Sequence, residues 1–149
     1  DATLEHILNT AKQAAEKGRD YGRVWMGASI ARRIDLAVEI AGHKTSVFER
    51  IVELYDLVGS TLATTETVPS AFGVLALADG DPYLCARYAA ALSGDADTVG
   101  AIACAIAGAW QGIDKIPIEL IETLKRVNDK LDFESVAQGL TTLAEERMV

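Results

Sequence analysis

The segment Ser93–Thr98 (SGDADT) gathers two carboxylates and a hydroxyl within a few residues. Asp95, Asp97 and Thr98 stand directly before a long apolar run. Carboxylate and hydroxyl oxygens are the hard ligands that magnesium, manganese and calcium prefer. In a loop that enters a helix, the two aspartates could turn their oxygens toward a common point. Because a D-x-D pair cannot fill an octahedral shell, further ligands must come from elsewhere.

A simpler interpretation of the same residues is helix capping. Asp97 or Thr98 could be an N-cap that accepts the first free backbone N–H groups of the following helix. Capping accounts for one polar residue, whereas three are packed together here. The local pattern leaves both interpretations open.

The elements that must position this segment are predicted to be helices throughout. Apolar residues recur at helical spacing from Leu4 to Ala15 and from Val24 to Ala41, with Gly42 as a stop. Helix starts are indicated by a capping-box pattern and by proline or aspartate at the first positions: Ser46 with Glu49, Asp81 with Pro82, Pro117 and Asp132. No stretch alternates as a half-buried strand would. We therefore expect one all-α domain over residues 1–149, a compact orthogonal arrangement of helices.

Two segments lack a polar face, Val68–Ala78 and Val99–Trp110. A helix that is apolar all round belongs in the middle of a bundle. The second segment is rich in alanine and glycine, and glycine weakens a helix interior by about 1 kcal/mol relative to alanine. Gly100 and Gly108 therefore indicate close packing of neighbouring helices, and we expect a buried Ala/Gly-rich central helix.

Composition narrows the possible partners. The net charge is −8, from 14 basic and 22 acidic residues. An acidic chain without a Lys/Arg cluster is a poor candidate for nucleic acid or an anionic membrane surface. The two cysteines, Cys85 and Cys104, are predicted to be small core residues, which disfavours a disulfide framework or a zinc site. Without a basic and apolar leader at its start, the chain is expected to be cytoplasmic.

Three segments together resemble the ADP-ribosylglycohydrolase family, which includes the glycohydrolase that reactivates dinitrogenase reductase. The match is to the C-terminal half of the family pattern, and its specificity is concentrated between Glu66 and Pro117. In order, the segments are Glu66–Ala71 (ETVPSA), Ala91–Ala103 (ALSGDADTVGAIA) and Gly108–Gly112 (GAWQG). A glycine often stands in the family where this chain has Ser93, a small difference that leaves the resemblance intact.

The resemblance implies an all-α fold, a site for two Mg²⁺ ions (Mn²⁺ is possible) and hydrolysis of the bond between ADP-ribose and a protein side chain. By this analogy Asp95, Asp97 and Thr98 are metal ligands. Glu66, Ser93 and Gly94 are expected to contribute to substrate binding, although Glu66 could also be a helix-start carboxylate. No catalytic residue can be assigned. The expected partner is an ADP-ribose-modified protein or an ADP-ribose derivative.

The family's N-terminal half, with its own acidic metal motif, has no counterpart in residues 1–65. We therefore expect this chain to hold about half of the metal site. It could be a fragment, one product of a cleaved enzyme, or a piece that pairs with an N-terminal companion segment or chain. Two alternatives remain: a non-catalytic relative that keeps only the fold, as in the family's lens crystallin members, and an unrelated helical interaction domain. Arg32 and Arg33 could meet a phosphate, but a solvated helix face is the simpler interpretation.

Overall fold

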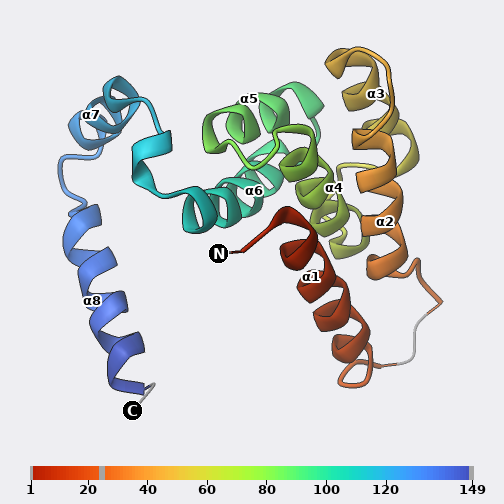
Figure 1. Ribbon diagram of the computed structural model, residues 1–149, viewed down its shortest axis with the longest axis horizontal. Helices are drawn as coiled ribbons and strands as arrows, with labels where there is room; N and C mark the ends of the chain where they lie inside the picture. The colour runs from red at the N-terminus through yellow and green to blue at the C-terminus, as the bar shows by residue number, and fades with distance from the viewer. Residues whose placement is uncertain (1, 24–25, 148–149) are drawn as a thin grey trace. The chain divides into compact units, whose positions relative to one another are not determined.

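The structure is a computed structural model that describes residues 2–23 and 26–147, and its regular elements are helices (Figure 1). No strand occurs among these residues. The all-α prediction is therefore confirmed. In chain order the elements are α1 (Leu4–Arg19), α2 (Ile30–Ala41), α3 (Val47–Leu57), α4 (Thr64–Leu77), α5 (Pro82–Leu92), α6 (Ala96–Gln111), the 3₁₀ turn η1 (Ile113–Lys115), α7 (Ile118–Val127) and α8 (Phe133–Arg147).

The chain divides into two compact units, Asp1–Lys115 and Ile116–Val149. The first contains α1 to η1, and with them every residue for which chemistry is predicted. The second contains α7 and α8. The single domain over residues 1–149 stays a prediction.

The predicted helix starts are present where side-chain chemistry marks them. Ser46 and Glu49 form a capping box at the start of α3. Asp81 accepts the backbone N–H of Leu84 at 2.8 Å, and Pro82 follows as the first residue of α5. Asp132 accepts the N–H of Ser135 at 2.9 Å before α8. Each of these residues satisfies an N–H group that has no partner within its own helix.

The start of α2 differs from the prediction. The helix begins at Ile30, with Ser29 as N-cap, and Ala28 lies in the preceding loop. Val24 lies outside the described residues. The apolar spacing continued upstream of the true start, and the Ser29 side chain, which accepts the N–H of Arg32 at 3.3 Å, marks the boundary instead.

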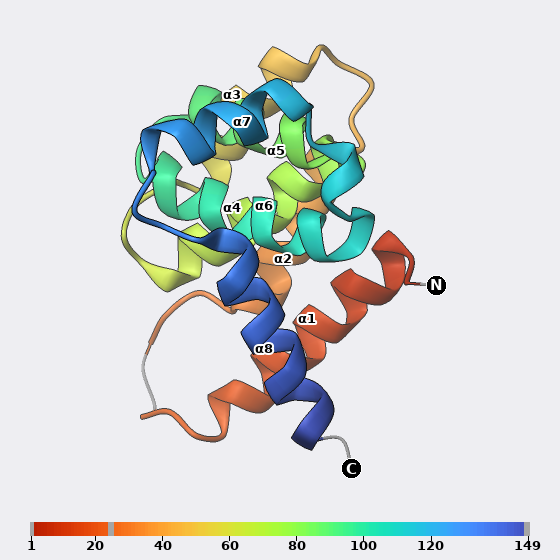
Figure 2. The ribbon, with the colours of Figure 1, turned by 90° about the vertical axis from the view of Figure 1, so that its left-hand side faces the viewer.

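α4 is the central helix of the first unit. It contacts α2, α3, α5 and α6, and Figure 1 shows it among them. α1 lies at the edge of this unit and packs against α2 (Figure 2). The prediction that this apolar segment is surrounded is confirmed, since eight of residues 68–78 are buried: Pro69, Ser70, Ala71, Phe72, Gly73, Val74, Leu75 and Ala78.

α6 is buried on one face only, so the expectation that it is surrounded on all sides is wrong. Its buried residues are Val99, Ala103 and Ala107. Ala101 and Ala105 are exposed. Alanine is apolar but small, so a run of alanines can stand on a solvent-facing side at little cost.

The small residues of α6 do not share one role. A Cβ on Gly100 would lie 3.4 Å from the Cβ of Ala89 on α5, so close packing at this position is confirmed. A Cβ on Gly108 would meet nothing within 4 Å, and the inference that packing selected this glycine is wrong.

Both cysteines carry free thiols. Cys85 lies in the core with no exposed surface, and Cys104 is half-buried. Burial, with a smaller effect from Cys104 and Asp81, raises the pKa of the Cys85 thiol to about 12. Burial also raises the pKa of Cys104. The prediction of core cysteines is therefore confirmed for Cys85.

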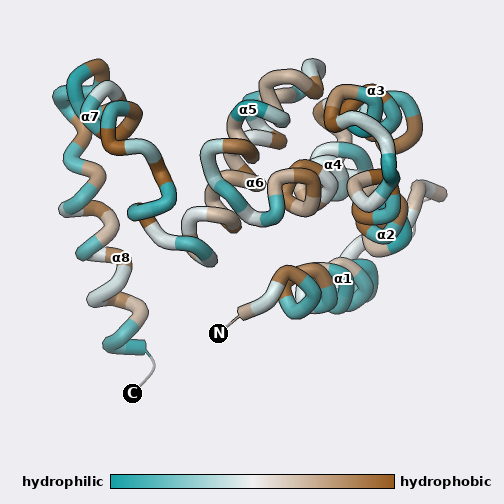
Figure 3. Tube along the Cα trace, turned by 45° about the horizontal axis from the view of Figure 1, so that its top comes forward, coloured by the Kyte–Doolittle hydropathy of each residue, from teal (hydrophilic) through white to brown (hydrophobic). Residues whose placement is uncertain are grey.

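In the second unit, apolar residues recur along α7 and α8 (Figure 3). Neither helix has a buried residue. Phe133, Val136 and Leu140 are at least one-third exposed although they recur at helical spacing. Within the described residues, no helix is long and apolar enough to cross a membrane.

Candidate functional site

The loop between α5 and α6 has an unusual backbone at its first residue. Ser93 has φ 68° and ψ −166°, and Gly94 has φ 66°. The conformation of Ser93 belongs to a region that is essentially restricted to glycine and costs other residues on the order of 1–3 kcal/mol. This backbone therefore favours glycine, the residue that often stands here in the family that the sequence resembles.

The loop is held by Ser60, which belongs to the α3–α4 loop. The Ser60 hydroxyl donates to the carbonyl of Ser93 at 2.9 Å, and the Asp95 N–H donates to the carbonyl of Ser60 at 2.8 Å. Ser60 is only 3% exposed. A Cβ on Gly94 would collide with the Ser60 carbonyl, so this approach requires glycine.

Asp95 and Thr98 are brought into direct contact. The Thr98 hydroxyl donates to Oδ1 of Asp95 at 2.9 Å. The capping interpretation of Asp97 or Thr98 is wrong, because α6 begins at Ala96 with Asp95 as its N-cap residue. The Asp95 side chain makes no hydrogen bond to the free N–H groups of the helix.

Asp97 is the second residue of α6, in the first turn of the helix, and it is exposed. A carboxylate in the first turn is favoured by the positive end of the helix dipole. Asp97 also borders a shallow groove between α5 and α6. The groove is otherwise lined by small residues: Ala86, Ala90, Ala96, Gly100, Ala101 and Cys104.

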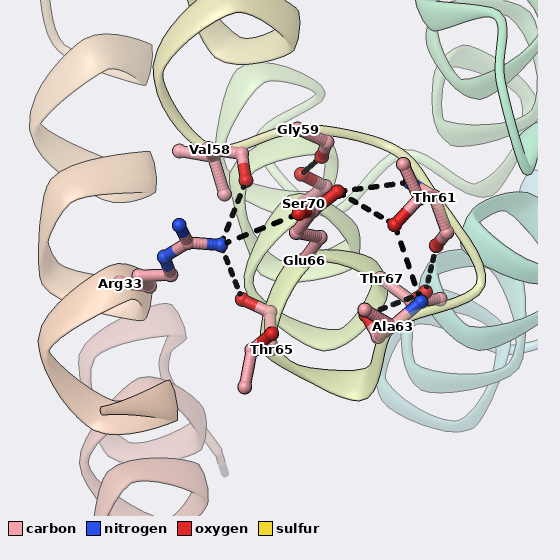
Figure 4. A network of polar contacts seen from close by, with 9 residues as sticks. All are labelled: Arg33, Val58, Gly59, Thr61, Ala63, Thr65, Glu66, Thr67 and Ser70. Carbon is pink, nitrogen blue, oxygen red and sulfur yellow. Dashed lines mark hydrogen bonds and ion pairs between the residues drawn. The ribbon is translucent and has the colours of Figure 1, made fainter. Parts of the chain in front are cut away.

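Glu66 lies in the first turn of α4 and turns back toward the loop before it (Figure 4). Its Oε2 accepts the N–H of Thr61 at 3.2 Å and the Thr61 hydroxyl at 2.8 Å. A Cβ on Gly59, which has φ 92°, would lie 2.5 Å from the same oxygen. Glu66 therefore organises the α3–α4 loop and is more than a carboxylate near a helix start.

Arg33 of α2 reaches the same loop from the other side (Figure 4). Its Nη1 donates to the carbonyls of Thr65 at 3.0 Å and Val58 at 3.1 Å, and lies 3.9 Å from Oε1 of Glu66. The interpretation of Arg33 as part of a solvated helix face is wrong, because the side chain is half-buried and binds backbone carbonyls. Arg32 is exposed.

Pro69 explains why the carbonyl of Thr65 has no N–H donor within its own helix. Proline has no N–H, so within α4 it cannot donate to the carbonyl four residues earlier, which is that of Thr65. Arg33 donates to that carbonyl instead. The proline of the ETVP segment therefore creates an acceptor inside the helix, and an arginine from another helix uses it.

The predicted residues thus fall into two groups. Ser93, Gly94, Asp95, Asp97 and Thr98 lie together at the start of α6, whereas Glu66 contacts the α3–α4 loop. Ser60 joins the two groups, a role that was not predicted, and the same holds for the contacts of Arg33. In the sequence, Ser60 and Thr61 mark a polar connection that could border a ligand cleft, but no local pattern links Ser60 to Ser93 and Asp95.

The chemistry available at this end of α6 is that of oxygen ligands. Adjacent ligands of an octahedral Mg²⁺, with bonds of about 2.0–2.1 Å, lie about 2.9 Å apart. The Asp95–Thr98 hydrogen bond of 2.9 Å has an ordinary length for such a bond and is also compatible with that spacing. In the described part of the chain, however, no three His, Cys, Asp or Glu residues come together as a metal site. The residues present fit part of a coordination shell.

Two comparisons with known proteins found a match. A family model described as ADP-ribosylglycohydrolase matches residues 1–148. The chain is 38% identical over 147 residues to the Escherichia coli (strain K12) protein named "Uncharacterized protein YegU". The match covers 98% of this chain and 42% of that relative, so the chain spans less than half the relative's length. No solved structure matches the chain significantly. The chain belongs to the ADP-ribosylglycohydrolase family.

Proposed function

We propose that this chain contributes one part of a metal-dependent site that hydrolyses the glycosidic bond between ADP-ribose and a protein side chain. Water adds across that bond, giving ADP-ribose and the free side chain. The substrate is an ADP-ribose-modified protein or an ADP-ribose derivative. Asp95, Asp97 and Thr98 would hold Mg²⁺ or Mn²⁺, with two ions in the complete site.

The contact between Asp95 and Thr98 carries the proposal. Their oxygens are 2.9 Å apart, and the Asp95 carboxylate caps no backbone N–H of the helix. Asp97 adds a second carboxylate two residues on, which is exposed, whereas Asp95 is half-buried. Among the described residues, no Lys or Arg forms an ion pair with either carboxylate. A cation would offset the repulsion between these two negative charges.

Bound divalent cations would supply the Lewis acid that polarises substrate oxygens and activates water. The residues of this chain hold the oxygen ligands in place. The α5–α6 loop presents Ser93 and Gly94 beside them, and both are exposed. We assign these two residues to the substrate side of the site. The remaining ligands would come from an N-terminal companion segment or chain.

Calorimetric titration of Mg²⁺ and of Mn²⁺ tests the proposal. The titrations use the chain alone and the chain mixed with an N-terminal companion of the family, in the wild type and in Asp95→Asn and Asp97→Asn. Binding is expected to be tight only in the mixture, and each substitution should abolish it. Asp114→Asn is the matched control, because Asp114 is an exposed aspartate in η1.

Helical content, measured by circular dichroism, should be the same in all of these variants, because both site carboxylates are at least partly exposed. Absence of metal binding under every condition would reject the proposal. It would favour a non-catalytic relative that keeps the fold alone.

A further inference from the structure

We propose that Glu66 and Ser60 are positioning residues that set the backbone of Asp95 from the neighbouring α3–α4 loop. The inference rests on the proposed function in one respect, because the role of Asp95 as a metal ligand comes from that proposal. Neither Glu66 nor Ser60 needs to touch metal or substrate for this purpose.

The first step is the anchoring of Glu66 by Arg33. The Arg33 guanidinium is fixed by two carbonyls, those of Val58 at the end of α3 and Thr65 at the start of α4. It also lies 3.9 Å from Oε1 of Glu66. A planar guanidinium suits several acceptors at once, so Arg33 ties the two ends of the connecting loop together (Figure 4).

The second step is the hold of Glu66 on the loop. Oε2 of Glu66 accepts both the N–H and the hydroxyl of Thr61, and hydrogen bonds to an ionised acceptor are stronger than those between neutral groups. Gly59 lies against the same carboxylate with no room for a Cβ. Ser60 lies between these two residues, so Glu66 restrains its backbone on both sides.

The third step is the restraint that Ser60 places on the backbone of Asp95. Ser60 donates its hydroxyl to Ser93 and accepts the N–H of Asp95 on its carbonyl. One buried residue therefore contacts the backbone at both ends of the strained turn Ser93–Asp95. These contacts oppose relaxation of the turn, which would otherwise move the start of α6 and with it the Asp95 carboxylate.

The test is residue-resolved backbone hydrogen exchange by NMR in the full 149-residue chain. The N–H of Asp95 reports the bond to Ser60 directly. Glu66→Gln is expected to speed its exchange by about tenfold or more, because a charge-assisted hydrogen bond in the supporting loop is weakened. Ser60→Ala should have an effect in the same direction. Amides in α1 and in the middle of α2 should keep their rates.

Glu53→Gln is the matched control. Glu53 is a similarly exposed carboxylate that lies 2.9 Å from Nδ1 of His43, and it belongs to α3. This substitution should leave the Asp95 amide unchanged. The inference is overturned if neither Glu66→Gln nor Ser60→Ala alters the exchange of Asp95. It is also overturned if exchange rises equally in all helices, since that result indicates only a loss of global stability.

Broadening of the Asp95–Thr98 amide signals by Mn²⁺ separates this inference from the proposed function. In the wild type, these signals should broaden at lower Mn²⁺ concentrations than in Glu66→Gln. If the exchange results are as expected and Mn²⁺ broadens nothing near α6 in the wild type, either alone or mixed with the N-terminal companion, the metal site is rejected while the positioning role stands. If Mn²⁺ broadens the signals and exchange is unaffected, the positioning role is rejected.

Discussion

α4 and α6 have similar apolar compositions and different environments. α4 contacts four other helices and buries Pro69, Val74 and Leu75 on different sides. α6 buries Val99, Ala103 and Ala107 on one face. Its opposite face consists of small residues that stand in solvent.

The difference shows that an apolar helix need not be a central one. The large side chains of α4, such as Phe72 and Leu75, gain the most from burial, since hydrophobic stabilisation is proportional to the apolar area removed from water. The alanines of α6 have little area to bury. Large apolar residues therefore predict burial on all sides better than small ones do.

Replacing an alanine by glutamate should change the free energy of unfolding far more on α4 than on α6, and we expect this to be the largest difference between the two helices. Ala71 is completely buried and Ala105 is exposed. Ala71→Glu should lower the free energy of unfolding by at least about 3 kcal/mol, because it buries an unpaired charge. Ala105→Glu should stay within about 0.5 kcal/mol of the wild type. Urea unfolding followed by circular dichroism measures both, and similar losses would mean that the outer face of α6 is covered.

Thiol labelling should distinguish the half-buried Cys104 of α6 from Cys85 of the core. With a pKa of about 12, about one Cys85 thiol in ten thousand is ionised at pH 8. Labelling of Cys85 should therefore follow unfolding, with Cys104 reacting first in the native protein. Mass spectrometry of tryptic peptides at timed intervals gives the order, and early modification of Cys85 would contradict its placement.

The raised pKa also sets the direction of a pH effect on stability. The folded form of Cys85 holds its proton to about pH 12, whereas an unfolded thiol loses it near about pH 8.5. Its contribution to stability is thus complete below about pH 8.5 and falls progressively as pH rises toward about 12. Urea midpoints measured across this range should fall less in Cys85→Ala than in the wild type.

Replacing a glycine by alanine should have opposite effects on the free energy of unfolding in α4 and in α6. A Cβ on Gly73 of α4 would lie 2.8 Å from Cδ1 of Leu54 and 3.1 Å from the Cβ of Ala37. Gly73→Ala should therefore destabilise the protein, with overpacking of about 1–3 kcal/mol reduced by a better helix propensity. Gly108→Ala on α6 should stabilise it by up to about 1 kcal/mol. Thermal unfolding of the two variants gives both signs, and stabilisation by Gly73→Ala would show that the core around α4 is loose.

The smallest effect is expected at the entrance to α6. Ser93→Gly should raise the free energy of unfolding by about 1 kcal/mol, because it relieves a backbone conformation that serine rarely adopts. Part of the gain is offset by the greater freedom of glycine in the unfolded chain. Urea unfolding is the measurement, and destabilisation would indicate that the serine side chain contributes contacts that outweigh the strain.

Much of the local structure was predictable from single residues. Ser46, Asp81 and Asp132 mark helix starts because each side chain satisfies an N–H group a few residues away. The start of α2 was harder to predict, since the apolar spacing continued past the true boundary at Ser29. The polar segment Asp95–Thr98 was visible in the sequence, but the contact between Asp95 and Thr98 was not, because it depends on where the helix begins.

The sequence by itself determined the helices, the all-α class and the family, because these depend on spacing, caps and short motifs that are local in the chain. Tertiary structure decided which apolar helix is central and which residues support the candidate site. Arg33 and Ser60 acquire their roles from carbonyls 25 to 33 residues away in sequence. Such contacts arise from the packing of helices against one another, and a local sequence pattern carries no record of them.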